Sequence, residues 1–311
     1  MGRLITKTNN LSREEWLSYR RNGIGGSDAA VVCGLSPYRS KIELWADKTG
    51  RLPDIEDNEA MRVGRDLEDY VAQRFCEATG KKVRRHNAMY SHDEYDFIRA
   101  NVDRDIVGEN AGLECKTTSA FARSDFAGGE IPAYYYCQCC HYMNVMGYDK
   151  MYLAVLVMGK GFYWFTIERN MDDCKALLDA EISFWQEHIL PDVRPAPDGS
   201  DSAARTISAL HEDWKDNAIT LFEQNDTAAE LMSVQEQIKA LELKEKKLKQ
   251  QLQLALDGNT DGFTVNHKIS WRPQKKTTLD TKLLRAELPA VWERYSRTTE
   301  SRVFRISERK D

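Results

Sequence analysis

The sequence has no long apolar run, and this absence limits what the protein can be. No stretch of its 311 residues approaches the roughly 20 apolar residues of a membrane-spanning helix, and the first residues lack the apolar core of a signal peptide. Walker loops, zinc-finger spacings and nucleophilic triads are missing as well. The seven cysteines, an odd number, are expected to be reduced thiols. We therefore expect a protein of the cytoplasm with no membrane association.

An excess of basic residues is also lacking. The chain has 44 lysines and arginines against 49 aspartates and glutamates, a net charge of −5. A pI above roughly 9 is typical of proteins that simply coat DNA. Basic residues are nevertheless clustered at Arg20 and Arg21, within residues 81–85 and within residues 268–282. An acidic body with a basic inner surface would accommodate both observations.

A metal cluster is one interpretation of the stretch Cys137-Gln-Cys139-Cys140-His141. The stretch is predicted to be helical, and on a helix Cys137, Cys140 and His141 share one side while Cys139 points away. No Cys-x-x-Cys partner that would complete such a cluster appears elsewhere in the sequence. We therefore favour reduced thiols here too.

The most informative stretch places Asp103 eleven residues before Glu114, which is followed two residues later by Lys116. Apolar residues alternate over 96–102 and 112–117, and a glycine-containing turn lies between them, so a β-hairpin is predicted. Alternation along the second strand puts Glu114 and Lys116 on one face. Asp103, at the end of the first strand, is expected to come alongside that face.

Such a constellation suits metal-assisted chemistry on phosphate. Two converging carboxylates form an oxygen site for Mg²⁺, which lowers the pKa of a bound water and neutralises charge on phosphoryl oxygens. A neighbouring lysine orients the attacking water or stabilises the transition state. The alternative is an exposed hairpin with a simple cross-strand ion pair. Asp105 is the one serious rival to Asp103 as a ligand.

The pattern Asp-(x)10-Glu-x-Lys resembles the core of the PD-(D/E)xK nucleases, with Val102 at the position of the usual proline. Further stretches resemble one branch, the λ-exonuclease/YqaJ-like phage recombination nucleases: Arg20 to Tyr38 with its Gly-Ile-Gly-Gly-Ser-Asp, Gly64-Arg-Asp-Leu-Glu68, and Tyr136-Cys-Gln138-Cys-Cys-His-Tyr142. The resemblance covers residues 10–170 and implies an α/β fold. Its PD-(D/E)xK, restriction-endonuclease-like core would have a mixed central sheet flanked by helices.

The resemblance implies a role for each matching residue. Asp103 and Glu114 would ligate the metal together with the backbone carbonyl of Cys115, and Lys116 would serve the attacking water. Two further side chains would support them: Glu68 and Gln138. Cys140 stands where the family has a second glutamine. A pocket for the 5′-terminal phosphate would be formed by these residues: Arg20 (or its neighbour Arg21), Ser27 and Asn101.

The implied activity is a Mg²⁺-dependent 5′→3′ exonuclease, with Mn²⁺ as a possible substitute, acting on linear double-stranded DNA with a 5′ phosphate. The exposed 3′ strand would pass to a single-strand annealing protein. The resemblance also implies a ring-shaped homotrimer, encoded by a phage or prophage and acting in the cytoplasm of a bacterial host. Two alternatives stay open: a structure-specific or restriction-type endonuclease on the same core, and a non-catalytic DNA-end-binding scaffold.

Capping residues and apolar periodicity predict the remaining elements of this region. Helices are expected over 13–20, 28–33 (capped by Ser27), 42–49, 59–79 (between Asn58 and Gly80), 133–147 and 172–188. Strands are expected over 82–91, 150–158 and 161–168.

The chain is expected to divide into a nuclease core (1–191), a linker and connecting segment (192–225), and a C-terminal part (226–311). Residues 231–255 follow a heptad spacing, which predicts either a coiled-coil helix for a partner or an arm packed on the C-terminal piece. That piece is predicted to be a small α+β domain with these elements: a strand over 263–271, a helix over 279–295 and a strand over 302–306.

Overall fold

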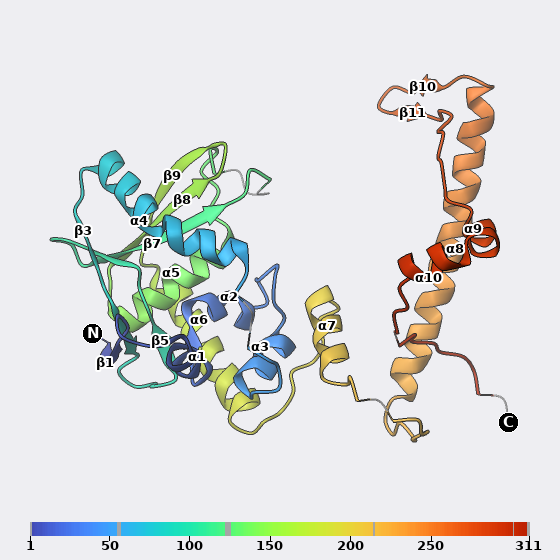
Figure 1. The fold of residues 1–311 in the computed structure, drawn as a ribbon. Coiled ribbons are helices and arrows are strands. Elements are labelled where there is room, and N and C mark those ends of the chain that lie inside the picture. Colours follow the sequence, from blue (N-terminus) through green and yellow to red (C-terminus); the bar gives the residue numbers. More distant parts are fainter. Residues whose placement is uncertain (1, 55–56, 122–125, 214, 301, 310–311) are drawn as a thin grey trace. The chain divides into compact units, whose positions relative to one another are not determined.

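The fold was analysed in a computed structural model that describes residues 2–54, 57–121, 126–213, 215–300 and 302–309 (Figure 1). The chain divides into two compact units, Met1–Trp214 and Lys215–Asp311, each of which is described by itself. Within the described residues, no helix combines the length and the hydropathy of a membrane span.

A five-stranded mixed sheet forms the centre of the N-terminal unit. Its strands are ordered β3 (Val83–Arg85), β6 (Arg104–Ile106), β7 (Ala111–Thr118), β8 (Lys150–Val157) and β9 (Gly161–Glu168). Strands β7 and β8 run parallel, whereas the other neighbours are antiparallel. The strands predicted over 150–158 and 161–168 are confirmed as β8 and β9, which form a hairpin. So is the α/β class with a mixed sheet flanked by helices.

A second sheet explains where the hairpin prediction was wrong. It has the order β1 (Arg3–Lys7), β4 (Ala88–Ser91), β5 (Ile98–Ala100) and β2 (Ile24–Gly25). Strand β5 belongs to this sheet, and the strand that pairs with β7 is the short β6. The single strand predicted over 82–91 is likewise divided between the two sheets as β3 and β4. Asp103 therefore lies where the chain crosses from one sheet to the other.

Helices cover both faces of the large sheet. Helix α4 (Glu59–Thr79) packs Val71 and Phe75 against one face, together with Leu113 of β7. Helix α5 (Ala133–Met146) packs against the opposite face, where it meets Leu153 of β8. Figure 1 shows α4 and α5 on either side of β7 and β8. This arrangement turns the even-numbered residues of β7, including Glu114, toward α5.

Local signals set the ends of these helices. Asn58 caps α4 by accepting the N–H of Met61, and Gly80 ends the helix in the left-handed conformation, with φ of 70°. Both ends were predicted, because side-chain caps and left-handed glycines act through a few neighbouring atoms. Gly147 likewise ends α5 in the left-handed conformation, with φ of 71°, whereas Pro132 precedes α5 without a side-chain cap.

Further helices complete this unit: α1 (Arg13–Arg21), α2 (Gly26–Val32), α3 (Lys41–Lys48), α6 (Met171–Phe184), the π-helix η1 (Trp185–Ile189) and α7 (Asp201–Ala209). Ser27 was wrongly expected to cap α2. Gly25 holds the cap position instead, and its N–H is bound by the carboxylate of Asp28 at 3.1 Å.

Helix α7 lies inside the segment predicted as a linker. Its Ser202 hydroxyl accepts the N–H of Ser40 at 2.9 Å, and Ala203 is buried against the cluster around α3. Because α7 buries apolar surface on α3, the compact unit extends to Trp214.

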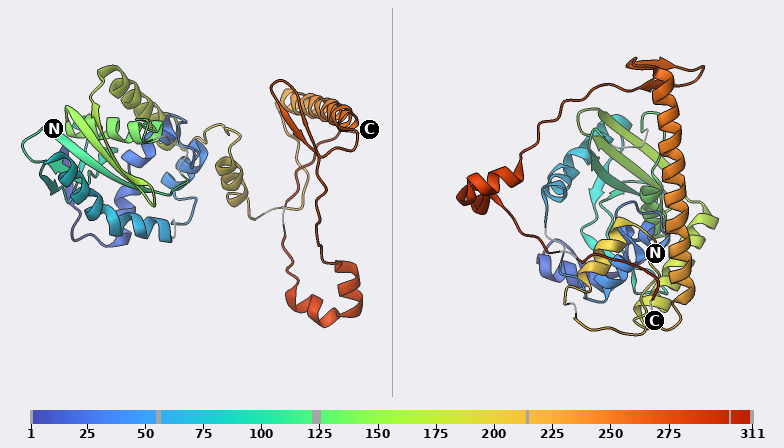
Figure 2. Two further views of the ribbon diagram at one scale, coloured as in Figure 1. Left: turned by 90° about the horizontal axis from the view of Figure 1, so that it is seen from above. Right: turned by 90° about the vertical axis from the view of Figure 1, so that its right-hand side faces the viewer.

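The C-terminal unit consists of α8 (Asn225–Leu256), the hairpin β10 (Asp261–Phe263) and β11 (Lys268–Ser270), and the short helices α9 (Thr281–Glu287) and α10 (Pro289–Tyr295). Figure 2 shows α8, in orange, as one unbroken helix.

Three predictions for this unit differ from the structure. The strand predicted over 263–271 is a hairpin. The helix predicted over 279–295 is interrupted at Leu288, since a residue before proline is disfavoured in helical backbone. Residues 302–309 contain no strand.

Candidate active site

Strand β7 carries the two charged residues at the centre of the site. Glu114 and Lys116 project from the same face, as predicted, and the Nζ atom of Lys116 lies 2.6 Å from Oε1 of Glu114. Asp103 reaches the same place from the crossing between the sheets. Its Oδ2 atom accepts the backbone N–H of Cys115 at 2.8 Å.

The carboxylates carry more negative charge than their surroundings balance. Burial, the neighbouring Glu114 and then Glu68 raise the pKa of Asp103 well above its ordinary value. Burial opposes the charge on Lys116, yet the attraction of Glu114 and Asp103 outweighs it and raises the pKa of this lysine. Glu114 is only 3% exposed, and its Oε2 atom is buried without a hydrogen-bond partner among the described residues.

Gln138 fixes the orientation of Glu114 from the opposite element. Its side-chain amide donates hydrogen bonds to Oε1 of Glu114 at 2.7 Å and to the hydroxyl of Tyr142, one turn along α5, at 2.9 Å. Because Lys116 and Gln138 both bind Oε1, the second oxygen of Glu114 is left available. Such an oxygen can coordinate a divalent cation.

Two other acidic residues near this site are held by basic partners. Oε1 of Glu68 accepts a hydrogen bond from Arg104 at 2.6 Å, so its carboxylate is engaged although its charge acts on Asp103. Asp105 is bound by the hydroxyl of Tyr148 and lies 2.8 Å from Nδ1 of His86. Burial opposes ionisation of Asp105, but these hydrogen bonds lower its pKa to about 2. Asp105 is thus part of a structural network.

The two carboxylates predicted for the metal meet the residues predicted for the phosphate in one pocket, which Glu68, Cys115 and Lys116 do not line. This pocket of about 200 Å³ is lined on one side by Asp103, Glu114 and Gln138, and elsewhere by Arg20, Ser27 and Asn101. Arg20 donates a hydrogen bond from Nη2 to the hydroxyl of Ser27 at 2.9 Å. Helix α1 and the start of α2, far from β7 in the sequence, thus supply one wall of the pocket.

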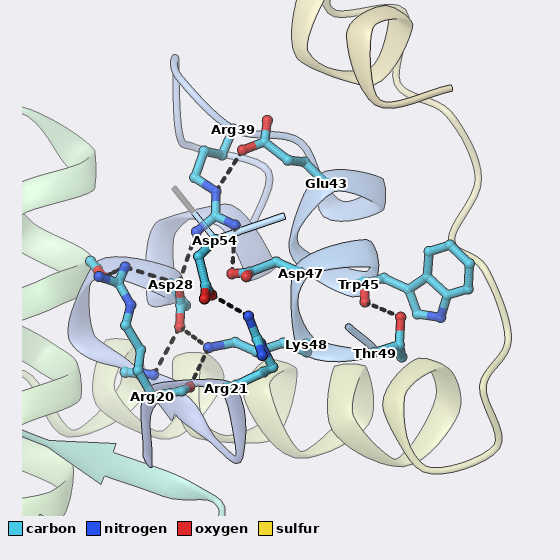
Figure 3. A network of polar contacts seen from close by, with 12 residues as sticks. Arg20, Arg21, Asp28, Arg39, Glu43, Trp45, Asp47, Lys48, Thr49 and Asp54 are labelled. Carbon is cyan, nitrogen blue, oxygen red and sulfur yellow. Dashed lines mark hydrogen bonds and ion pairs between the residues drawn. The ribbon is translucent and has the colours of Figure 1, made fainter. Parts of the chain in front are cut away.

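The choice between the two arginines is decided by where their side chains point. Arg20 lines the pocket, whereas Arg21 forms an ion pair with Asp54 and does not line it (Figure 3). Trp16 lies beside Arg20, with its ring 5.4 Å from the guanidinium. Of the two arginines, Arg20 alone is placed to meet a ligand beside Asp103.

Comparison with known proteins identifies the family. Residues 15–149 match the family described as "YqaJ-like viral recombinase domain". "Uncharacterized protein YqaJ" of Bacillus subtilis (strain 168) is 41% identical over 310 residues, which are 98% of this chain and 97% of that protein. The chain belongs to the YqaJ-like viral recombinase family. Its core has the PD-(D/E)xK arrangement: Asp103, Glu114 and Lys116 lie together beside strand β7 of the mixed sheet.

Solved structures of exonucleases are similar to this YqaJ-like protein at low identity. The alkaline exonuclease LHK-Exo of Laribacter hongkongensis is 19% identical with a TM-score of 0.47, and the match covers 56% of this chain and 91% of that chain. A phage-related exonuclease of Haemophilus somnus 129PT is 12% identical with a TM-score of 0.43, covering 55% and 97%.

A buried ion-pair network behind Arg20 escaped the sequence analysis (Figure 3). Asp28 is fully buried, and its Oδ2 atom receives Nζ of Lys48 at 2.7 Å. The same lysine donates to the backbone carbonyl of Arg20 at 2.8 Å, while Arg39 lies 3.4 Å from Asp28. Burial disfavours the charged form of Asp28, but Lys48, Arg20 and Arg39 outweigh it and lower its pKa. Lys48 is the last residue of α3 and belongs to no recognisable motif, so no local pattern marks it.

Glycines allow the segment that contains Gly23 and the start of α2 to pack closely against its neighbours. A Cβ atom at Gly26 would lie 2.7 Å from Cε1 of Tyr142, and one at Gly23 would lie 2.6 Å from the carbonyl oxygen of Phe97. Both distances are shorter than any tolerable contact. A larger residue at Gly26 would push α2 away from α5, and one at Gly23 would push the chain away from Phe97. The glycine-rich turn noted in the sequence therefore has a packing function in this YqaJ-like fold.

The cysteine-rich part of α5 lies behind the site. Both nitrogens of His141 are engaged, Nδ1 with Glu181 at 2.7 Å and Nε2 with the carbonyl of Arg99 at 2.8 Å. Among the described residues, no three or more His, Cys, Asp or Glu side chains are grouped so as to hold a metal ion. The metal site predicted in the sequence has only two carboxylates, Asp103 and Glu114, with a backbone carbonyl as its third oxygen.

Proposed function

We propose that this protein is a metal-dependent deoxyribonuclease, a 5′→3′ exonuclease that degrades one strand of linear double-stranded DNA. The observation that carries the proposal is the single pocket in which Asp103, Glu114 and Gln138 face Arg20 and Ser27. An arginine and a hydroxyl suit a terminal phosphate, and the carboxylates with Lys116 suit hydrolysis of the adjoining phosphodiester.

The residues of the pocket fit a magnesium ion, with manganese as a substitute. Glu114 has a buried oxygen without a partner among the described residues, and burial together with repulsion from Glu114 raises the pKa of Asp103. Asp103, Glu114 and the backbone carbonyl of Cys115 would hold the ion. When bound, Mg²⁺ neutralises charge on phosphate oxygens and acidifies a bound water.

The chain's own side chains supply the remaining chemistry. Lys116, kept protonated by Glu114, would hold the attacking water or the developing negative charge. Gln138 would hold Glu114 in the orientation that leaves Oε2 open. Arg20, braced by Ser27, would position the terminal phosphate so that the first phosphodiester lies at the carboxylates.

The recombination role rests on the family. We propose that the product, a duplex with a 3′ overhang, is passed to a single-strand annealing protein of the same phage or prophage. A ring-shaped homotrimer would keep the enzyme on its DNA. The 5′→3′ direction rests on the match of Arg20 and Ser27 to the phosphate pocket of the λ-exonuclease family.

The test uses purified protein and duplex DNA labelled on either strand, with a 5′ phosphate or a 5′ hydroxyl, in Mg²⁺ or in EDTA. We expect Mg²⁺-dependent loss of the 5′ strand, faster with the phosphate, and no loss with Lys116→Ala. Covalently closed circular DNA should stay intact. Cutting of closed circles without end preference would indicate an endonuclease, and tight binding without cleavage in any divalent metal would indicate a scaffold.

A further inference from the structure

Helix α8 exposes an apolar stripe. The helix has 32 residues, of which Leu256 alone is buried. The stripe residues are 41% to 64% exposed: Val234, Ile238, Leu241, Leu248 and Leu252. A stripe of exposed apolar side chains of this kind, interrupted by Glu245, is usually covered by a partner. The C-terminal unit therefore presents a surface that needs a partner.

The spacing of the stripe is that of a coiled-coil seam. Apolar residues recur at alternating intervals of three and four, which gives these a and d positions: Leu231, Ile238, Glu245 and Leu252 at a, and Val234, Leu241, Leu248 and Ala255 at d. A strict a/d seam is narrow and suits one facing helix of the same geometry. This favours a helix as the occupant.

The charges on α8 select which helix faces it. Residues 225–243 contain four acidic side chains and one basic, a net charge of −3. Residues 244–256 contain four basic side chains and one acidic, a net charge of +3. Two copies side by side in parallel would oppose like charges along their length, whereas two antiparallel copies bring the acidic half onto the basic half.

The helix macrodipole does not account for this charge pattern. Acidic residues near a helix N-terminus and basic residues near its C-terminus are favourable, but the effect fades beyond the first and last turns. Glu242, Lys244 and Lys246 lie in the middle of α8. Within the helix, Lys249 pairs with Glu245, but the separation of the acidic half from the basic half suits a second charged helix alongside.

We infer that α8 docks on α8 of a second copy of this chain, in antiparallel orientation. In this register Glu245 lies opposite Leu248 of the second copy. Glu242 then faces Lys249 of the second copy, and the two-fold symmetry creates the same ion pair a second time. A parallel arrangement would bring the two copies of Glu245 together in the seam. It would also place Lys244 beside Lys249 of the second copy. A single polar seam residue such as Glu245 fixes register in this way.

The first test measures the mass of the full-length protein in solution by light scattering. We expect an even multiple of the 35.7 kDa chain, which is six copies if α8 joins two of the proposed trimeric rings. Leu241→Glu, which places charge in the seam, should halve the mass. Leu243→Glu is the matched control: it makes the same change on the same helix, at a residue 69% exposed outside the seam, and should leave the mass unchanged. Equal masses for the two variants would overturn the proposal.

The second test fixes the orientation by charge reversal. Glu242→Lys alone and Lys249→Glu alone should each weaken the assembly about fivefold, because each variant creates two like-charge contacts. The double variant should restore wild-type affinity. Tighter assembly with Lys249→Glu alone would indicate parallel helices. A monomeric wild-type protein would show that the stripe is covered by its own chain or by another protein.

Discussion

Glu114 is the central residue of the pocket. One of its oxygens is held by Lys116 and Gln138, and the other has no partner among the described residues. Burial and the nearby charge of Glu114 together raise the pKa of Asp103. Two buried carboxylates left in this state destabilise a fold. A function that uses a cation and a phosphate is a physical reason to keep them.

Asp105 lies two residues from Asp103 and is predicted to contribute to stability instead. Its folded pKa of about 2 lies below the ordinary value of 3.8, so its contribution is fully present above about pH 4 and is lost as the pH falls toward 2. Asp105→Asn should lower the free energy of unfolding by about 2 kcal/mol at pH 7. Urea titrations at several pH values should show this difference shrinking below pH 4. A constant difference would contradict the assignment.

Lys48 is predicted to act as a positioning residue for Arg20. It binds both the carbonyl of Arg20 and the carboxylate of Asp28, so Lys48→Met should let the arginine move. We expect the preference for 5′-phosphate over 5′-hydroxyl ends to fall about tenfold, the effect of losing roughly 1.4 kcal/mol. Cleavage of hydroxyl ends should change little.

Two further variants separate positioning from general damage. Lys48→Arg keeps the charge and should recover part of the preference even if the methionine variant folds poorly. Lys41→Met makes the same change on the same helix, away from the pocket, and should behave as wild type. A Lys48→Met protein that slows cleavage of both kinds of end equally would show a purely structural role.

At the scale of helices and strands, the sequence predicted features that depend on neighbouring residues and missed those that depend on residues distant in the sequence. The ends of α4 follow from Asn58 and Gly80, whose effects reach only a few residues. The hairpin prediction failed because residues 98–100 and 104–106 both alternate as strands should. Only contacts with β2 and β4, distant in the sequence, place the first in the smaller sheet.

The site was predictable where a motif carried it. Asp103, Glu114 and Lys116 stand at a recognisable spacing, and Arg20 and Ser27 belong to a glycine-rich stretch. Lys48 and Asp28 were not predicted together, because their pairing appears only when α2 and α3 are packed. The choice of Arg20 over Arg21 likewise needed Asp54, which occupies the second arginine.

The contact between α2 and α5 should be sensitive to a single methyl group. Gly26→Ala would bring Cβ to within 2.7 Å of the Tyr142 ring, which shares a hydrogen bond with Gln138. We expect a loss of about 1–3 kcal/mol in the free energy of unfolding, together with slower cleavage. Gly64→Ala, inside α4, meets nothing closer than 3.8 Å. It should stabilise the protein by about 0.5–1 kcal/mol. Equal thermal midpoints for the two variants would contradict this account.

At the scale of the whole molecule, the chain consists of two compact units, and the pocket lies entirely in the first. The relative from Bacillus subtilis matches both units, since its similarity extends over 310 residues. The pocket and the α8 surface are therefore separable in principle, although this relative also carries both units on one chain.

Truncation should separate them in practice. A chain of residues 1–214 is expected to fold and to cleave short duplexes at a rate near that of the full protein. A chain of residues 1–199 lacks α7, and with it Ala203 and the Ser202 contact to Ser40, so it should unfold at a lower temperature. Circular dichroism melts and a cleavage assay check both. Loss of folding in the longer piece would show that the second unit supports the first.

The central claim is that Asp103 and Glu114 form a metal-dependent nuclease site. The most direct measurement is single-turnover cleavage of a 5′-phosphorylated linear duplex in Mg²⁺ by wild type, Asp103→Asn and Asp105→Asn at pH 7.5. The two variants make the same change two residues apart. We expect cleavage by wild type and Asp105→Asn, and none by a folded Asp103→Asn protein. Undiminished cleavage by Asp103→Asn would contradict the account.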